Sequence, residues 1–329
     1  MSTPKLLSPT EYVASAIKKI DRARERITLV TMMMASDGET EALFEALSRA
    51  AQRGVHVEIA ADVFTFGELG GHLKPYRYYT KRSRQTNDMS KRLVRDGAKF
   101  TWLGKLSTSP FSGRNHMKCL VVDDVIYSFG GVNLDSESLT YGDYMFEIND
   151  RQLAQELRDD IARIIEADHK HFAYRSHEFS FGKDSKVLID GGLQGDSIIY
   201  RRACSIVKEA ESVLYVSQYC PTNKMSRLLK KARARLYFNQ PKRANRSFNK
   251  LLIGLSMLLS GNKSKYRRSR YLHAKFIIAT MKDGRKIALT GSHNFTYVGV
   301  AFGTREIALE TTNPKIIAQL ERFFETSVK

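Results

Sequence analysis

Hydrophobic positions along the chain follow two alternating patterns, one typical of amphipathic helices and the other of short buried strands. The helical spacing predicts helices in both halves of the chain, at residues 9–25, 39–53, 151–171, 196–211, 223–233 and 313–327. Runs of apolar and β-branched residues predict strands beside them, at residues 27–33, 55–61, 213–218 and 235–238. Helices that alternate with strands indicate an α/β protein of two units, each a sheet covered by helices.

An internal repeat accounts for the symmetry of these elements. Residues 116–133 read HMKCLVVDDVIYSFGGVN, and residues 273–294 read HAKFIIATMKDGRKIALTGSHN. Both copies open with His-x-Lys, run through two apolar stretches joined by a turn, and close with Gly-(Gly/Ser)-x-Asn. The second copy is four residues longer, which fits a longer hairpin with Asp283-Gly284 in its turn. A glutamate follows each copy inside an apolar stretch, Glu147 in the first and Glu306 in the second.

The residue types of the repeat suit cleavage of a phosphodiester. A histidine and a lysine two residues apart on a strand point to the same face, so each hairpin aims both at one place. Two imidazoles can supply a nucleophile and an acid near neutral pH, while lysine and asparagine donate hydrogen bonds to phosphoryl oxygens. Each glutamate can accept a proton from the far imidazole nitrogen. The candidate catalytic residues are His116, Lys118, Asn133, Glu147, His273, Lys275, Asn294 and Glu306.

The paired motifs resemble the phospholipase D superfamily, whose motif is often written HxKxxxxD. The first copy matches in full with His116, Lys118 and Asp123, whereas the second has Thr280 in place of the aspartate. The resemblance implies a duplicated phospholipase D-like α/β fold. Two α/β/α sandwich units related by a pseudo-twofold axis then share one active site. We expect the units to span residues 1–180 and 181–329, joined in the glycine-rich stretch 182–195.

The resemblance also implies a mechanism with a phosphohistidine intermediate. One histidine attacks phosphorus, and the other protonates the departing alcohol and then deprotonates the acceptor. We assign His116 as nucleophile because its copy is intact, and His273 as acid and base. Asp123 joins the catalytic set, although its place after the strand suits bracing of the hairpin. His293 is interpreted as a packing or turn residue, and no metal or cofactor is expected.

The charge of the chain is concentrated in two segments. Lys and Arg number 53 against 35 Asp and Glu, a net charge of +18, which predicts a polyanionic partner. Residues 72–95 carry eight cations and one acid (8 − 1 = +7), and residues 241–272 carry nine cations and no acid (+9). Each segment precedes the His-x-Lys hairpin of its own half, so we expect both to flank the mouth of the active site.

The second basic segment is interpreted as a basic amphipathic insertion, 241–272. Its apolar residues follow helical spacing between cations, which favours a helix lying in a membrane interface. An ordinary core helix is the alternative. The candidate substrate- and membrane-binding residues of the two segments are Arg82, Arg84, Lys250, Leu252, Leu255, Arg267 and Arg268.

Composition sets the expected location. The chain contains no run of about 20 apolar residues that would span a bilayer. Its three cysteines, Cys119, Cys204 and Cys220, are too few and scattered for a disulfide framework, which fits a reducing cytoplasm. We expect a cytoplasmic protein peripherally associated with an anionic phospholipid membrane. A monomer is expected because the duplication already supplies both halves of the site.

Within the superfamily, the first hairpin is similar to cardiolipin synthases and related bacterial phosphatidyltransferases. This resemblance implies transfer of a phosphatidyl group from a phospholipid to an alcohol acceptor, with hydrolysis as a side or main reaction. A nuclease or phosphodiesterase acting on nucleic acid remains an alternative, because the same site serves and the basic segments supply phosphate contacts. A catalytically inactive binding module is a third reading, based on Thr280.

Overall fold

The computed structural model describes residues 3–66, 80–104, 113–244 and 247–329. Contacts divide the chain into two compact units. Unit 1 comprises residues 1–128, 132–139 and 145–174, and unit 2 comprises residues 129–131, 140–144 and 175–329. Two short segments of the first half of the sequence therefore belong to unit 2.

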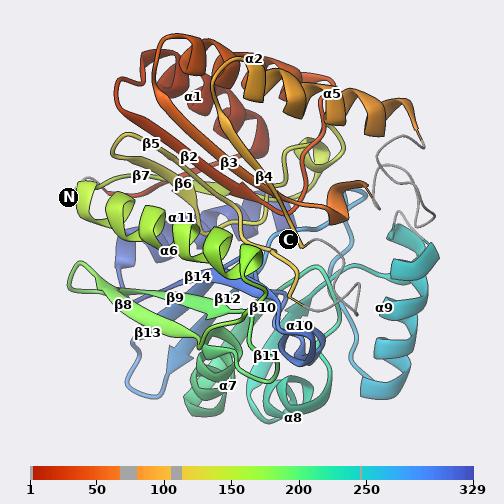
Figure 1. The fold of residues 1–329 in the computed structure, drawn as a ribbon. Helices are drawn as coiled ribbons and strands as arrows, with labels where there is room; N and C mark the ends of the chain where they lie inside the picture. The colour runs from red at the N-terminus through yellow and green to blue at the C-terminus, as the bar shows by residue number, and fades with distance from the viewer. Residues whose placement is uncertain (1–2, 67–79, 105–112, 245–246) are drawn as a thin grey trace. The chain divides into compact units, whose positions relative to one another are not determined.

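Unit 1 is built on a seven-stranded sheet in the order β1-β7-β6-β5-β2-β3-β4. Helices α1, α2 and α5 lie over one face of this sheet and α6 over the other (Figure 1). The strands are β1 (Lys5–Leu7), β2 (Arg26–Thr31), β3 (His56–Asp62), β4 (Lys99–Leu103), β5 (Cys119–Val122), β6 (Val125–Ser128) and β7 (Met145–Asn149). The helices are α1 (Pro9–Arg22), α2 (Glu39–Gln52), α5 (Lys81–Arg95) and α6 (Arg151–His169), with a 3₁₀ turn at Ser138–Thr140.

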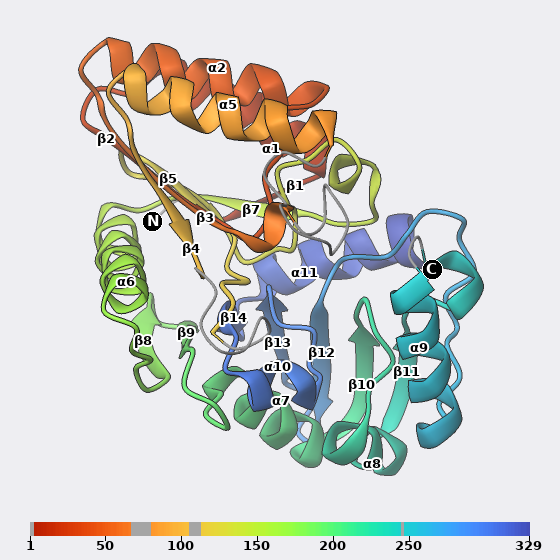
Figure 2. The ribbon, with the colours of Figure 1, turned by 45° about the vertical axis from the view of Figure 1, so that its right-hand side comes forward.

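Unit 2 has a second seven-stranded sheet, in the order β11-β10-β12-β13-β14-β9-β8. Figure 2 shows α7 and α8 on one face of this sheet and α11 on the other. The strands are β8 (His177–Phe181), β9 (Ser185–Gly191), β10 (Ala210–Val216), β11 (Arg233–Tyr237), β12 (Phe276–Met281), β13 (Lys286–Gly291) and β14 (Arg305–Thr311). The helices are α7 (Ile198–Glu209), α8 (Asn223–Lys231), α9 (Ser247–Ser260), α10 (Tyr297–Phe302) and α11 (Pro314–Phe323); a 3₁₀ turn spans Pro241–Arg243 and a π-helical turn Phe324–Val328.

The two sheets share a six-stranded order, which confirms the duplicated α/β fold. β3-β2-β5-β6-β7-β1 in unit 1 corresponds to β11-β10-β12-β13-β14-β9 in unit 2. In both units the first two of these strands pair in parallel and the others antiparallel. Each sheet has one extra edge strand, β4 next to β3 and β8 next to β9. Each His-x-Lys motif leads into an equivalent central strand, β5 or β12.

The join predicted at 182–195 is wrong. Residues Ser185–Gly191 form β9, which pairs along its length with β14 inside the second sheet. The boundary between the units lies at Tyr174–Arg175 instead. The glycines at both ends of this stretch are turn residues with positive φ, Gly182 at 65° and Gly192 at 89°. These glycines flank a buried strand. Their presence made the composition of the segment resemble that of a linker.

Helix α5 was missed in the sequence because its inner face is polar. The buried residues of α5 include Ser83, Thr86, Asn87 and Ser90, with Met89 and Leu93 between them. A helix whose buried face is mainly hydroxyl and amide groups has no hydrophobic stripe to reveal its period. The rest of the first basic segment, residues 72–79, lies outside the described residues.

The segment 241–272 is the counterpart of α5 and β4, not an addition to a complete scaffold. In unit 1 the chain passes from β3 through α5 to β4, which pairs with β3. In unit 2 it passes from β11 through α9 to residues 262–266, where the Lys265 amide donates to the Leu236 carbonyl of β11 at 2.8 Å. Asn262, Ser264 and Tyr266 are buried there while Lys263 and Lys265 are exposed. This alternation matches that of an extended segment running beside β11.

Candidate active site

The two His-x-Lys motifs have the same local geometry. Lys118 Nζ donates to the His116 carbonyl at 2.8 Å, and Lys275 Nζ donates to the His273 carbonyl at 2.6 Å. Both lysine side chains are buried. The same contact in both copies shows that the repeat extends to the placement of side-chain atoms, including the second copy, where Thr280 replaces the aspartate.

In unit 2, His273 is held by an aspartate. Asp143 Oδ2 lies 2.6 Å from His273 Nδ1, and Lys275 Nζ lies 3.1 Å from the same nitrogen. The other carboxylate oxygen, Oδ1, accepts from the backbone amides of Gly131 at 3.2 Å and Tyr144 at 2.8 Å. With Nδ1 fixed in this way, Nε2 is the nitrogen of His273 that can exchange a proton with a substrate.

The electrostatics of this group favour an ionised carboxylate. Burial by itself raises the pKa of Asp143, but the hydrogen bond from His273 and the charges of His273 and Lys275 outweigh it, and the pKa lies below its ordinary value. Burial also lowers the pKa of Lys275 to about 8, although Asp143 and Glu306 oppose that shift. Lys275 is therefore a buried cation whose charge changes within the working range of many enzymes.

Backbone contacts place Asp143 beside His273. The Gly142 carbonyl accepts from the amides of His273 at 3.0 Å and Ala274 at 2.9 Å, and the Gly142 amide donates to the Tyr271 carbonyl at 2.8 Å. These bonds explain why residues 140–144 belong to unit 2. A Cβ atom at Gly131 would lie 2.6 Å from Asp143 Oδ2 and 2.8 Å from Lys275 Nζ. The second glycine of the Gly-Gly pair in the first repeat copy therefore cannot be replaced by a larger residue without a clash.

Sequence reasoning missed Asp143 and proposed glutamates as the partners of the imidazoles. Glu147 lies on β7, where its carboxylate accepts a hydrogen bond from Ser15 of α1. Strand register explains the difference. Leu120 and Ile277, each four residues after its histidine, pair with Tyr127 and Leu289.

Those two residues pair in turn with Glu147 and Glu310. The counterpart of Glu147 is therefore Glu310, and Glu310 likewise contacts the helix above it, through Arg202 of α7. Glu306, four residues before Glu310, corresponds to Asp143, four residues before Glu147. The sequence carried this signal as DYMFE (143–147) and EIALE (306–310), whose acids are equally spaced.

Glu306 lies buried in unit 2 beside the second motif. Its carboxylate accepts from the Ser292 hydroxyl of the Gly-Ser-x-Asn sequence. Its charge acts on Lys275 and also on His293. Glu306 is thus placed next to the Gly-Ser-x-Asn sequence of the second motif, and its role toward an imidazole stays a prediction.

The two predicted asparagines follow the ends of equivalent strands. Asn133 follows β6 and Asn294 follows β13. The side-chain oxygen of each is buried, and neither oxygen has a hydrogen-bond partner among the residues the structure describes. A buried polar atom with no partner in the protein can bind a water molecule or a ligand. Both carboxamides therefore remain candidates for contact with a substrate.

Asp123 braces its hairpin. Its carboxylate accepts from three successive amides, those of Arg24 at 3.0 Å, Glu25 at 3.1 Å and Arg26 at 3.0 Å. It occupies the tight β5–β6 turn with φ of 48°. In the longer second hairpin, Thr280 lies within β12 and pairs with Ser212 and Lys286. The replacement therefore changes a turn and leaves the His-Lys geometry intact.

His293 is a packing residue, as predicted. It is buried, and its Nδ1 accepts from the Phe295 amide at 2.8 Å. Burial lowers its pKa, with Glu306 acting in the opposite direction. A neutral imidazole that accepts from the backbone suits a structural role.

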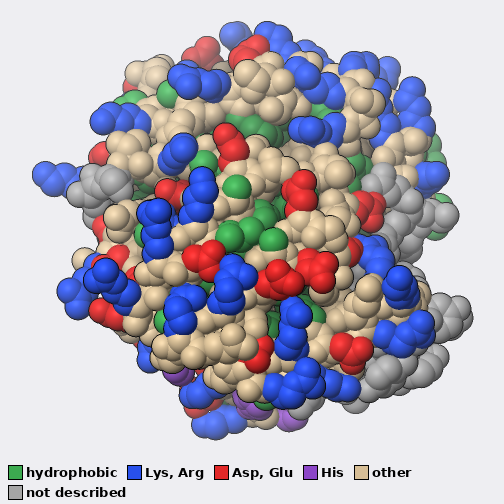
Figure 3. Space-filling view, turned by 90° about the horizontal axis from the view of Figure 1, so that it is seen from above, with side chains coloured by type: hydrophobic (Ala, Val, Ile, Leu, Met, Phe, Trp, Pro, Cys, Tyr) green, Lys and Arg blue, Asp and Glu red, His purple; other side chains and the backbone are tan. Residues whose placement is uncertain are grey.

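The residues predicted to bind substrate or membrane divide into two groups. Arg82 forms an ion pair with Asp37, whose Oδ2 accepts from its Nε at 2.8 Å, and so fixes α5 to the loop before α2. Arg84, Lys250, Arg267 and Arg268 are exposed. On the side of α2 and α5, Figure 3 shows Lys and Arg side chains interspersed with Asp and Glu.

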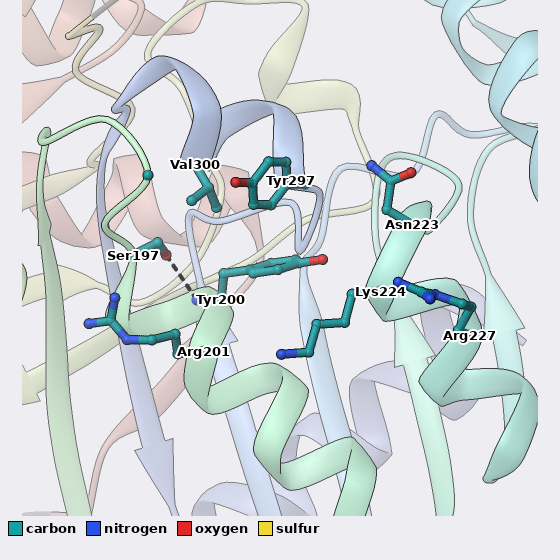
Figure 4. A pocket seen from close by; sticks show the side chains of 9 residues that line it. Ser197, Tyr200, Arg201, Asn223, Lys224, Arg227, Tyr297 and Val300 are labelled. Carbon is teal, nitrogen blue, oxygen red and sulfur yellow. Dashed lines mark hydrogen bonds between the residues drawn. The ribbon is translucent and has the colours of Figure 1, made fainter.

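Unit 2 also contains a cavity of about 340 Å³ near the start of α7 and α8. Figure 4 shows Tyr200 and Tyr297 on one side and the cations Lys224 and Arg227 on another. None of the predicted catalytic residues belongs to its described lining. The candidate site is therefore the buried group around His273 and its counterpart at His116, rather than this cavity.

Comparisons with known proteins agree with the repeat. A sequence profile of the family described as "Cardiolipin synthase, PLD-like domain" matches residues 16–165 and 206–328. Cardiolipin synthase B of Shigella flexneri and that of Escherichia coli K12 are each 30% identical to this chain over 141 residues. The match covers 40% of this chain and 30% of the length of those relatives.

Solved structures share the fold across nearly the whole chain. Phosphatidylserine synthase of Haemophilus influenzae has a TM-score of 0.74 at 15% identity, covering 99% of this chain and 87% of that protein. Polyphosphate kinase of Porphyromonas gingivalis has a TM-score of 0.63 at 12% identity, covering 98% and 50%. Within the described residues, no helix combines the length and apolar character needed to cross a bilayer. Because the family profile covers most of both halves, the chain belongs to the phospholipase D superfamily, among the cardiolipin synthase-like proteins.

Proposed function

We propose that this chain transfers a phosphatidyl group from a glycerophospholipid to an alcohol acceptor through a phosphohistidine intermediate, with hydrolysis when water is the acceptor. The observation that carries the proposal is the buried Asp143–His273–Lys275 group, which combines a proton carrier, a carboxylate that orients it and a cation. Family membership and the matching Lys118–His116 contact support it.

In the proposed reaction, His116 attacks phosphorus, and the bond from phosphorus to the departing alcohol breaks. His273 donates its Nε2 proton to that alcohol oxygen. An acceptor hydroxyl then gives its proton to His273 and attacks phosphorus, which releases His116. Lys118, Lys275 and the two asparagines donate hydrogen bonds to the phosphoryl oxygens as negative charge develops there. Asp143 stabilises the imidazolium form of His273.

The test is lipid profiling by mass spectrometry. Wild-type protein and His116→Ala are incubated with vesicles of phosphatidylglycerol, phosphatidylethanolamine and cardiolipin, with glycerol, serine and ethanolamine present. We expect a new phospholipid species with the wild type and none with the variant. Phosphatidic acid as the only new product would show that the protein hydrolyses phospholipids and does not transfer the phosphatidyl group. An unchanged lipid profile would refute action on these phospholipids.

Nucleic acid is the second candidate substrate, favoured by the cations of the segment 241–272. The same two-histidine chemistry cleaves a phosphodiester in a nucleic acid strand. Incubation with single-stranded and double-stranded DNA separates the candidates, because a nuclease would cut DNA and leave the phospholipids unchanged. Cleavage lost in His116→Ala would establish this second function.

The pKa of Lys275 predicts how the transfer rate depends on pH. Since burial lowers this pKa to about 8, the rate is expected to fall above pH 8 as the lysine loses the charge that stabilises the phosphoryl oxygens. The effect on folding stability has the opposite sign. Between pH 8 and about 10.4 Lys275 is protonated in the unfolded chain and largely deprotonated in the folded chain, so the free energy of unfolding rises with pH. Measuring kcat and Tm over the same pH series checks both signs.

Lys275→Met serves as the matched control for that series. We expect it to be slow throughout and to lack the decline centred near pH 8, because it has no proton to lose. A wild-type rate that stays constant to pH 10, or a decline that persists in Lys275→Met, would assign the pH dependence to another group.

A further inference from the structure

Helix α9 exposes a row of leucines. Leu251, Leu255, Leu258 and Leu259 are 68%, 50%, 80% and 77% exposed. Their spacing of i, i+4, i+7 and i+8 places them on one side of the helix. An exposed apolar row of this length on a soluble protein indicates an interaction surface. Leu252, predicted to belong to this surface, is half-buried and lies outside the row.

The opposite side of α9 is attached to unit 2. Ile253 is fully buried and packs in a small cluster with Ala244 and Tyr271. Asn249 Oδ1 accepts from the Tyr219 hydroxyl at 3.2 Å, and the Ser260 carbonyl accepts from Lys230 Nζ at 2.5 Å. Figures 1 and 2 show α9 beyond the β11 edge of the second sheet. The helix is therefore fixed on its inner side with its leucines facing outward.

The cations around α9 indicate an anionic partner. Segment 241–272 has nine cations and no acid. Seven of them are exposed, and no carboxylate of the described chain forms an ion pair with any of them: Lys242, Lys250, Lys263, Lys265, Arg267, Arg268 and Arg270. A second copy of this surface would bring like charges together, which opposes self-association. Nucleic acid would satisfy the cations but would leave the leucines in water.

We propose that α9 docks unit 2 on the surface of an anionic phospholipid bilayer. The four leucines enter the boundary between headgroups and acyl chains, and the cations that flank the helix contact lipid phosphates. This inference rests on the proposed function, because it identifies where the phospholipid substrate is met. It also explains how a chain whose described helices do not span a bilayer reaches a lipid substrate.

Vesicle co-sedimentation tests the docking without reference to turnover. Wild-type protein is mixed with vesicles of phosphatidylcholine alone or with vesicles that also contain about 30% phosphatidylglycerol, enough for a negative surface potential. A variant with all four leucines changed to serine is compared with Val94→Ser, which alters a residue that is 52% exposed on α5 in unit 1. We expect binding to anionic vesicles to fall by about tenfold or more in the leucine variant and to remain unchanged in Val94→Ser.

A fluorescence measurement avoids the risk that four substitutions disturb folding. The native cysteines are buried, so a polarity-sensitive dye can be placed at Leu258→Cys or, as control, at Val94→Cys. A blue shift on anionic vesicles at Leu258→Cys alone supports insertion. Equal spectra at both positions, or equal binding of the wild type and the leucine variant, would overturn the proposal. A change from dimer to monomer in the leucine variant, with unchanged vesicle binding, would also overturn it.

Turnover of a short-chain phospholipid below its micelle concentration separates the two proposals. If both stand, the leucine variant turns over this dissolved substrate at the wild-type rate but loses activity on vesicles by about tenfold or more. Vesicle binding that depends on the leucines, together with no turnover of either substrate, would support docking and refute the proposed function.

Discussion

His273→Ala is expected to stop the reaction after its first step when the leaving group needs no proton. With a p-nitrophenyl phosphodiester, His116 can still attack phosphorus because nitrophenolate departs without an acid. The acceptor is then not deprotonated, so the phosphohistidine accumulates. We expect a burst of one nitrophenolate per protein followed by turnover about 10² to 10⁴ times slower than wild type, the usual contribution of a general acid and base. Stopped-flow absorbance measures the burst.

His116→Ala is the matched comparison, because it removes the nucleophile and leaves the Asp143–His273–Lys275 group in place. It should give no burst and no adduct. Mass spectrometry of peptides prepared at alkaline pH locates the phosphoryl group in His273→Ala. An adduct on His273 in the His116→Ala protein would exchange the two roles. Absence of an adduct in both variants would refute the covalent mechanism.

The repeat made the positions of the strands that follow the two His-x-Lys motifs predictable. Two His-x-Lys copies followed by Gly-(Gly/Ser)-x-Asn at similar spacing specify two equivalent hairpins, and β5–β6 and β12–β13 form at those places. The apolar periodicity of the flanking helices was also sufficient to predict where they begin. α1, α2, α6, α7, α8 and α11 all begin within three residues of their predicted starts.

What escaped prediction depends on burial of polar groups and on register. Helix α5 packs a face of serine, threonine and asparagine, which hydrophobic spacing does not detect. The place of Asp143 depends on which residues of β6 and β7 face each other, and a spacing counted along the chain contains no such pairing. Its partner His273 is 130 residues away in sequence. The bonds of Gly142 to residues 271–274 help to bring the two together.

The same reasoning explains why the second copy tolerates Thr280. An aspartate is needed where the strand ends in a tight turn and must accept the amides of residues 24–26. The longer second hairpin moves the turn to residues 282–285 and leaves position 280 inside β12, where a β-branched residue suits the strand. The loss of one motif residue in this copy therefore reflects hairpin length and gives no support to an inactive module.

Asp143→Asn is expected to reduce kcat by about 10³ to 10⁴-fold with little change in KM, as for other carboxylates that orient a catalytic imidazole. The carboxylate accepts the Nδ1 proton of His273 and so keeps Nε2 ready to exchange a proton. An amide NH₂ facing Nδ1 would instead favour the tautomer that carries its proton on Nε2, which cannot accept the proton of the acceptor alcohol. Steady-state kinetics of phosphatidyl transfer across pH 5 to 9 measures the loss and any shift of the profile.

Glu147→Gln is the control that separates a positioning role from general loss of charge near the motifs. Glu147 lies on β7, four residues after Asp143, and contacts Ser15 of α1. The register counterpart of Glu147 is Glu310 and not Glu306. We therefore expect the kcat of Glu147→Gln to stay within about twofold of wild type, because the side chain does not contact a reacting group. Both variants should keep the wild-type Tm within a few degrees if folding is intact. A large loss in Glu147→Gln with near-normal Asp143→Asn would restore the glutamate as the partner of the imidazole. The opposite result would establish that orientation of His273 depends on the carboxylate that Gly142 and its backbone bonds hold against Nδ1.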